Sequence, residues 1–263
     1  MIALLTACGV LMSSPPPCPA HVIAVSPHTQ SGPTCLVAAG LTAVSPHSGK
    51  TITVREVARE VPVWPDGVDG YDLTVAMAKR GWDSLLFTGP PEAAARLVEA
   101  GFPAVALVTH QRRIHAVTVH GAQRKAAEAG GCGRALDSLL VLDPRTARST
   151  WESASAFAER QSAERWIVFY RPQDAHKLDD RGFPLAIAQR VDRRLRAQAL
   201  VRRAKKHPQA NEQSLVLLQQ AHALDPCWPR VRQLLQDTLI RLKRPHTLPA
   251  LTDRCKYAIQ GAK

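Results

Sequence analysis

The stretch "HTQSGPTCLVAAGLTAV", residues 28–44, sets a polar segment directly before a run of small apolar residues. Thr34 follows Pro33 and is a suitable N-cap, so we expect a helix over residues 34–44. This places Cys35 in the first turn, where the positive end of the helix dipole would stabilise a thiolate. Three roles are open for Cys35: core residue, disulfide partner or nucleophile.

Helical patterns continue before β-rich ones begin. Apolar residues at three- and four-residue spacing predict helices over residues 53–61, 72–82 and 91–101. β-branched runs then predict a hairpin over residues 102–121, with the polar "HQRR" as its turn, and further strands in "SLLVLDP" and "RWIVFYRP". Four helices followed by an antiparallel sheet indicate an α+β domain, residues 22–172.

Residues 173–263 are expected to form a separate, basic helical tail. The segment 172–263 holds 18 Lys and Arg against 8 Asp and Glu, so it carries most of the net charge of +12. A helix is predicted over residues 185–206, and residues 214–245 resemble one and a half tetratricopeptide-type repeats. The basic run 190–206 could attract phosphates or anionic lipid headgroups. It lacks interleaved aromatic residues, which argues against nucleic acid as a partner and favours a solvated helix face.

The amino terminus, residues 1–21, is expected to be an export segment and linker. It is an apolar run followed by Ser and Pro, too short to span a bilayer. "LTAC", residues 5–8, resembles the lipobox of bacterial lipoproteins, which would make Cys8 a lipid anchor at the cell envelope; a frayed apolar terminus is the alternative. The six cysteines form no CxxC pair and no zinc-finger spacing, so neither a disulfide scaffold nor a structural zinc site is predicted. Cys132, in "GGCGR", is interpreted as incidental.

A cysteine nucleophile needs a histidine that accepts the thiol proton and a further group that orients this histidine. "RRIHAVTVHG" offers His115 at a strand start, and "VLDP" offers Asp143 at the end of the next strand. Neighbouring antiparallel strands would bring these two side chains together. Gln30 stands five residues before Cys35, and the Gly-Pro pair between them favours a turn. Its amide could then stabilise an oxyanion together with the Cys35 N–H.

Other interpretations of these residues are also open. His110 and His120 compete with His115, but strand alternation puts His115 and His120 on opposite faces, so only one of them can face Cys35. The same alternation scatters the three histidines over two faces, which argues against a metal site. Asp143 precedes a proline and could instead cap a turn.

As an ordered set, these motifs resemble the papain-like cysteine peptidases of the bacteriocin-processing, or double-glycine leader, family and its stand-alone bacterial relatives. The resemblance covers residues 22–172, through "Q....C" and its helix, "GFPAVALV", "HAVTVHG", "VLDP" and "W...A.F....ERWIVFYRP". It implies a papain-like fold with Gln30 as oxyanion donor, Cys35 as nucleophile, His115 as base and Asp143 as orienter, and with no cofactor or metal. Some stand-alone relatives also carry an export signal and a helical-repeat tail.

The activity that the resemblance implies is hydrolysis of peptide bonds, with leader-peptide processing as its specific task; acyl transfer from the same thioester is equally compatible. Two departures stand against it. Leu36 replaces the Gly that commonly follows the catalytic cysteine in relatives, and an insertion-like segment, residues 122–137, separates His115 from Asp143. Leu36 favours the alternative of a non-catalytic binding or scaffold protein that acts through its helical tail. The expected partners are a peptide or protein substrate, a protein bound by the tail, and a membrane surface.

Overall fold

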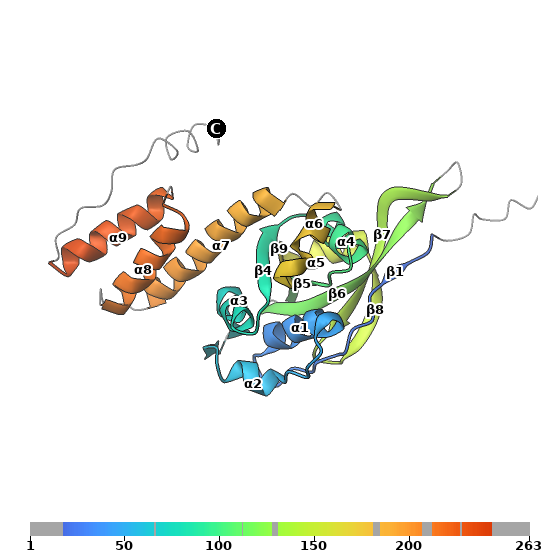
Figure 1. Ribbon diagram of the computed structural model, residues 1–263, viewed down its shortest axis with the longest axis horizontal. Coiled ribbons are helices and arrows are strands. Elements are labelled where there is room, and N and C mark those ends of the chain that lie inside the picture. The colour runs from blue at the N-terminus through green and yellow to red at the C-terminus, as the bar shows by residue number, and fades with distance from the viewer. Residues whose placement is uncertain are drawn as a thin grey trace, which may run out of the picture.

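The structure is a computed structural model, and it describes residues 18–65, 67–111, 113–127, 131–180, 185–206, 212–226 and 228–243. In this part of the chain a mixed helix and sheet domain is followed by a group of helices that extends to one side (Figure 1). The proposed export segment, with Cys8, lies outside the described residues. No described helix combines the length and the hydropathy that a membrane crossing requires.

The domain is built on one seven-stranded antiparallel sheet. Its order is β4-β9-β5-β6-β7-β8, and β1 pairs with β6 beside this path. The strands are β1 (His21–Val22), β4 (Asp83–Thr88), β5 (Ala104–His110), β6 (Arg113–Ala126), β7 (Cys132–Asp143), β8 (Arg148–Ser153) and β9 (Gln161–Tyr170). A separate two-stranded ribbon consists of β2 (Val63–Trp64) and β3 (Gly67–Val68).

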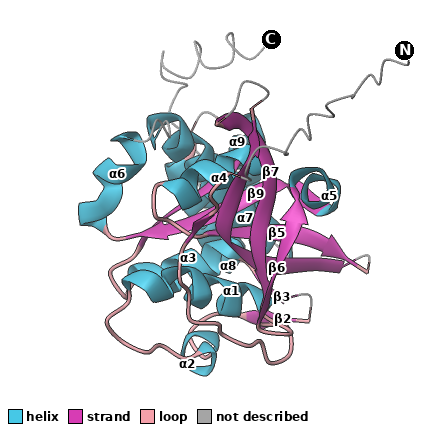
Figure 2. Cartoon of the chain, turned by 90° about the vertical axis from the view of Figure 1, so that its right-hand side faces the viewer, coloured by secondary structure: helices cyan, strands magenta, loops and turns pink. Residues whose placement is uncertain are grey.

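Helices cover both faces of this sheet (Figure 2). One face packs under α1 (Cys35–Val44), α2 (Val54–Ala58) and α3 (Gly70–Ala78). The other packs under α4 (Pro91–Glu99), α5 (Ala154–Arg160) and α6 (Ala175–Asp180). Each face has its own apolar core, so the sheet is buried on both sides, and the α+β class expected from the sequence is observed.

The expectation of four helices before any strand is wrong. β4 lies between α3 and α4, where the sequence pattern places only a helix end, and it pairs along its whole length with β9. β4 reads "DSLLFT", in which only Leu85, Leu86 and Phe87 are apolar. Such a short apolar run shows no clear period, so the sequence pattern does not reveal the strand. β8 was also not predicted, because residues 148–153 are mostly polar and exposed.

The segment 122–137, expected to be an insertion, instead extends β6 and β7 into one long hairpin. Cys132 begins β7 and forms a disulfide with Cys18 just before β1. Its interpretation as incidental is therefore wrong, and the prediction of no disulfide scaffold did not anticipate this single bridge. The two cysteines are 114 residues apart in sequence, so no local spacing pattern could reveal the pairing.

The tail contains α7 (Leu185–Lys206), α8 (Glu212–Leu224) and α9 (Pro229–Arg241), which share a third apolar core. The helices expected over residues 185–206 and on both sides of the "LDPCWP" turn are observed, whereas the tetratricopeptide assignment stays a prediction. α7 runs along β4, the edge strand of the sheet (Figure 1).

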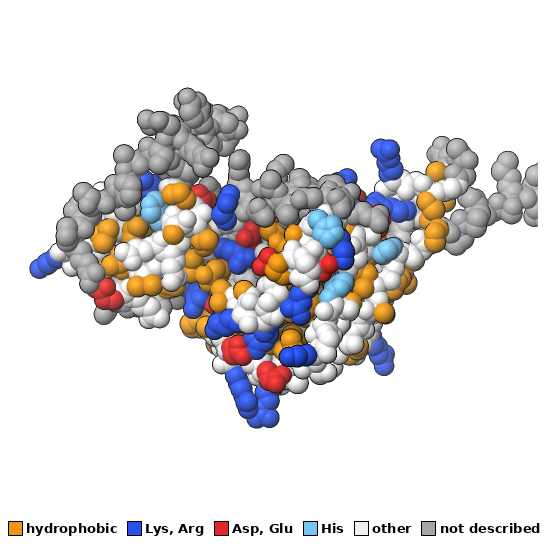
Figure 3. All heavy atoms as spheres, in the orientation of Figure 1, with side chains coloured by type: hydrophobic (Ala, Val, Ile, Leu, Met, Phe, Trp, Pro, Cys, Tyr) orange, Lys and Arg blue, Asp and Glu red, His pale blue; other side chains and the backbone are white. Residues whose placement is uncertain are grey.

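Polar side chains fasten α7 to the domain. Asp192 accepts the backbone N–H of Leu86 on β4 at 2.8 Å and binds Arg196 Nε at 2.7 Å. Arg196 also reaches the backbone oxygen of Ser84 at 2.9 Å, and Arg203 pairs with Asp72 of α3. These arginines contradict the expectation that the basic run is a solvated face, because they bind the domain. Elsewhere, lysines and arginines are dispersed over the visible surface rather than gathered in one patch (Figure 3).

Candidate active site

Cys35 is the first residue of α1, and a compact turn precedes it. The Thr34 hydroxyl accepts the Ser31 N–H at 3.1 Å and donates to the Ser31 carbonyl oxygen at 2.9 Å. Gly32 allows this turn, because its φ of +62° lies in the left-handed region. Thr34 thus holds the expected N-cap position, although its hydroxyl binds the preceding turn rather than an N–H of the helix. Cys35 is half-buried and is the free cysteine among the described residues.

The rest of α1 is buried and fixed against the sheet. Gly40 lets α1 approach α3 closely, because a Cβ there would lie 2.9 Å from Leu73 Cδ2. The Thr118 hydroxyl of β6 donates to the Ala39 carbonyl oxygen at 2.9 Å. The helix that carries Cys35 is therefore bound directly to the strand that carries His115.

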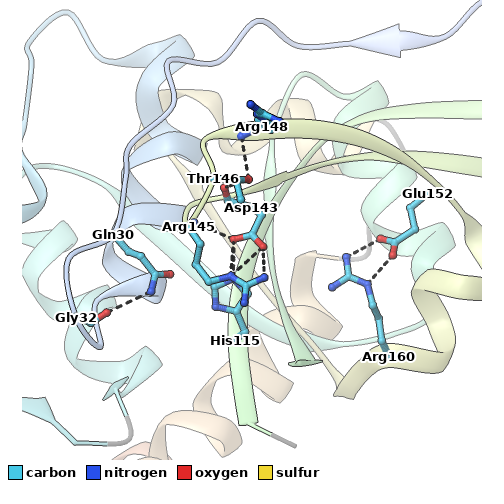
Figure 4. A network of polar contacts seen from close by, with 9 residues as sticks. All are labelled: Gln30, Gly32, His115, Asp143, Arg145, Thr146, Arg148, Glu152 and Arg160. Atoms are coloured by element: carbon cyan, nitrogen blue, oxygen red, sulfur yellow. Dashed lines mark hydrogen bonds and ion pairs between the residues drawn. The ribbon is translucent and has the colours of Figure 1, made fainter. Parts of the chain in front are cut away.

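His115 and Asp143 form a hydrogen-bonded pair (Figure 4). His115 Nε2 lies 2.9 Å from Asp143 Oδ1, and the histidine is only 7% exposed. An ionised carboxylate only accepts hydrogen bonds, so Nε2 carries the proton and Nδ1 is left with a free lone pair. Burial lowers the pKa of His115, and the contact with Asp143 opposes this only in part. The ring is consequently neutral at pH 7 and able to accept a proton through Nδ1.

Arg145 holds the Asp143 carboxylate from the opposite side, a contact that sequence reasoning missed. Its Nη2 lies 2.7 Å from Asp143 Oδ2, and its backbone N–H donates to Oδ1 at 2.8 Å (Figure 4). Burial alone would raise the pKa of Asp143, but the hydrogen bonds from Arg145 and His115 bring it well below its ordinary value. Asp143 raises the pKa of Arg145 in return, and the charge of a Cys35 thiolate adds to this. Asp143 is therefore ionised over the physiological range.

Gln30 lies in the loop before α1 and is tied to the Asp143 turn. Its backbone N–H donates to the Pro144 carbonyl oxygen at 3.0 Å. Its side-chain Nε2 donates to the Gly32 carbonyl oxygen at 3.3 Å, and its Oε1 is buried with no hydrogen-bond partner among the described residues (Figure 4). An amide nitrogen carries two N–H groups, so one remains able to bind a further acceptor.

Cys35 and His115 line the same cavity, whose volume is about 160 Å³. Its walls come from the start of α1, the β3–α3 segment, strands of the sheet and α7. The lining residues include Asp69, Leu86, Arg165, Ile167 and Arg202. Leu36 also lines it, but this side chain is only 4% exposed and belongs to the core beneath α1. Leu36 therefore presents little surface to a substrate.

The two alternatives to His115 are His120 and His110. His120 binds the Ile23 carbonyl oxygen through Nδ1 and the Ser149 hydroxyl through Nε2, both at 2.9 Å. The ring of His110 lies 6.2 Å from that of His115, measured between centroids. No group of three metal-binding side chains occurs in the described parts of the chain. The structure thus places Cys35 and His115 on one cavity, with Asp143 hydrogen-bonded to His115 and the loop of Gln30 bonded to the turn after Asp143.

Comparison with known proteins identifies similar solved structures. No family model matches the chain, and no curated protein matches it in sequence. A double-glycine motif protease from an AMS/PCAT transporter, solved with its leader peptide, matches with 16% identity and a TM-score of 0.43 over 58% of this chain and 96% of that chain. The peptidase domain of Streptococcus ComA, a bifunctional ABC transporter, matches with 15% identity and a TM-score of 0.43 over 56% of this chain and 97% of that chain. The peptidase domain of Streptococcus mutans ComA matches with 15% identity and a TM-score of 0.37 over 55% of this chain and 98% of that chain.

Proposed function

We propose that this protein is a papain-like cysteine peptidase that uses Cys35 as nucleophile, His115 as base and Asp143 as orienter. The observation that carries the proposal is the shared cavity: a half-buried free thiol at a helix amino terminus lines the same cavity as a histidine held by a carboxylate. The helix terminus favours a thiolate, and a neutral imidazole is the group that can accept its proton.

In the first half of the reaction, the Cys35 thiol gives its proton to His115 Nδ1 and the sulfur attacks the peptide carbonyl carbon. The resulting oxyanion is stabilised by the Cys35 backbone N–H, which has no acceptor within the helix, and by the Gln30 side-chain amide. His115 then protonates the leaving amine, and the C–N bond breaks to give a thioester.

In the second half, water attacks the thioester carbonyl while His115 Nδ1 accepts the water proton. The C–S bond breaks, the acid product leaves, and the proton returns to sulfur. Asp143 keeps the Nε2 proton in place throughout, so Nδ1 is free in each step. An amine that replaces water would give acyl transfer instead. Double-glycine leader peptides are the substrate that the sequence motifs suggest.

The test is alkylation of the native protein by iodoacetamide at mildly acidic pH, followed by peptide mapping. A thiol activated by His115 reacts faster than an ordinary cysteine, which is mostly protonated there. We expect Cys35 to react at least about tenfold faster than the other free thiols. His115→Ala should remove this advantage. His120→Ala is the matched control, since His120 lies on the same strand but binds only Ile23 and Ser149.

Cleavage of a peptide pool by wild type, compared with Cys35→Ala, then identifies the products by mass spectrometry. New carboxyl termini indicate hydrolysis, and amide adducts indicate acyl transfer. If Cys35 reacts no faster than the other thiols and no peptide is cut, the chain is instead the binding or scaffold protein of the alternative.

We also propose that the protein is exported. The support is the disulfide between Cys18 and Cys132, because disulfides persist in oxidising compartments and are rare in the cytosol. Fractionation of cells with thiol trapping tests this: the two cysteines should be protected from alkylation in an envelope fraction. A cytosolic protein with both thiols free would contradict it.

A further inference from the structure

The cavity beside Cys35 contains two arginines that the proposed chemistry does not use. Arg165 lies on β9, opposite Thr88 of β4, and Arg202 lies on α7. Both line the cavity together with Cys35 and His115. Arg202 thus brings the helical tail into the wall of the proposed active site.

The charges in this cavity are not balanced. Asp69 is the carboxylate among its described lining residues, and its Oδ1 already accepts the Tyr71 backbone N–H at 2.9 Å. Its Oδ2 lies 3.5 Å from Arg202 Nη2. The guanidinium of Arg165 forms no hydrogen bond or ion pair with another side chain that the structure describes, although its backbone belongs to the β4–β9 pairing. Among the described lining residues, two guanidinium groups therefore accompany one carboxylate, an excess of one positive charge.

Arg165 is also partly removed from water. It is half-buried and shares the cavity wall with the apolar side chains of Leu86 and Ile167. Burial and the charge of Arg202 both lower the pKa of Arg165, with Asp69 opposing them. Arginine nevertheless stays protonated in proteins, and a charge withdrawn from water gains most from a bound counter-ion.

We infer that this cavity recognises a carboxylate of the substrate, with Arg165 as the principal contact and Arg202 as the second. The planar fork of a guanidinium matches both oxygens of a carboxylate, and the apolar wall strengthens the attraction. The inference rests on the proposed function in taking the bound molecule to be a peptide. It predicts a preference for peptides that place a carboxylate close to the bond that is cut.

Two groups of a peptide have this chemistry: an Asp or Glu side chain, and the free α-carboxylate at the end of the chain. The cavity volume of about 160 Å³ is below the roughly 300–1,000 Å³ of pockets that enclose a whole drug-sized ligand. It therefore suits one group of a peptide rather than the whole molecule, and an experiment has to compare the two sources.

The test measures how well peptides protect Cys35 from iodoacetamide, which reports occupancy whether or not the peptide is cut. One set is acetylated hexapeptide amides of alanine and leucine with a single Glu at each position in turn. The second set carries Gln in the same positions. The third is the neutral hexapeptide with a free carboxyl terminus. Wild type is compared with Arg165→Gln, Arg202→Gln and, as a matched control, Arg148→Gln, an exposed arginine of β8 outside the cavity.

We expect one Glu peptide to protect wild type at about tenfold lower concentration than its Gln partner. This ratio should fall to about one in Arg165→Gln, fall partly in Arg202→Gln, and persist in Arg148→Gln. Protection by the free-acid peptide instead would support the inference with the α-carboxylate as source. Equal protection by acidic, amidated and free-acid peptides would overturn it, as would a Glu preference that survives in both arginine variants. An ordinary thiol is also alkylated at higher pH, so the protection assay works even if Cys35 is not activated. Failure of the peptidase proposal is therefore distinguishable from failure of this inference.

Discussion

Arg145 shapes the proposed active site without reaching the cavity lining itself. It binds Asp143 through its guanidinium and its backbone N–H, while His115 occupies the remaining position on Oδ1. This arrangement keeps Asp143 ionised and aimed at His115 Nε2. The identity of the proton-accepting ring nitrogen thus depends on a residue that takes no part in bond making.

Arg145→Gln is expected to destabilise the fold by about 1–2 kcal/mol at neutral pH, since charge-assisted hydrogen bonds are lost from a partly exposed pair. The folded pKa of Asp143 lies below its ordinary value, so its contribution to stability is complete above the unfolded pKa of about 3.9 and is lost as the pH falls through the folded value. Removal of Arg145 raises the folded pKa. The difference in Tm between the two proteins should therefore be largest near pH 7 and shrink as the pH falls through the folded pKa of Asp143 in the variant, which lies between the wild-type value and about 3.9.

Thermal unfolding at pH 7, 4 and 2 measures this difference. Arg148→Gln, in the same turn region but without a side-chain contact to Asp143, serves as control and should match wild type at every pH. A difference that stays constant from pH 7 to pH 2 would show that Arg145 acts through packing rather than through the carboxylate.

The sequence predicted the positions of single residues where a local sequence pattern indicates the structure around them. Cys35 at a helix start follows from "GPTC" and the small apolar run after it. The first half of β6 follows from its β-branched residues, and the end of β7 follows from the apolar run "LLVL". Arg145 was missed because "DPRT" is equally typical of a solvated turn. Arg165 and Arg202 were missed because their cavity forms only when β9 and α7 come together.

At the scale of elements, α7 protects the exposed edge of the sheet. β4 is an edge strand, and unpaired N–H groups on such a strand can recruit another chain. Asp192 accepts one of these groups, that of Leu86, and is itself paired with Arg196. The sequence pattern did not reveal β4, and it suggested that the charges of α7 are solvated. In the structure, α7 covers β4 through two of these charged side chains, Asp192 and Arg196.

Asp192→Ala is expected to destabilise the protein by about 2–4 kcal/mol, because it removes the carboxylate that pairs with the largely buried Arg196 and the acceptor of the Leu86 N–H. Chemical denaturation monitored by circular dichroism measures the loss. Arg193→Ala, an exposed neighbour on the same helix, is the control and should stay within about 0.5 kcal/mol of wild type. Equal effects of the two variants would mean that Asp192 does not anchor α7.

For the whole molecule, the Cys18–Cys132 disulfide joins the segment before β1 to the far end of the β6–β7 hairpin. Replacing both cysteines by serine should lower the free energy of unfolding by about 2–4 kcal/mol, since the cross-link restricts the unfolded chain over a long loop. A reducing agent should lower the Tm of wild type to that of the double variant and leave the double variant unchanged. If reduction has no effect on wild type, the bridge does not contribute to stability.

The position of α7 has a consequence for how such proteins diverge. One helix seals the edge of the sheet and also supplies a wall of the reaction cavity. Recombination that grafts a foreign tail onto the sheet domain would therefore also replace the part of the cavity lining that α7 supplies. Under the proposed function, a change of tail would alter substrate preference as well as the protection of the sheet edge.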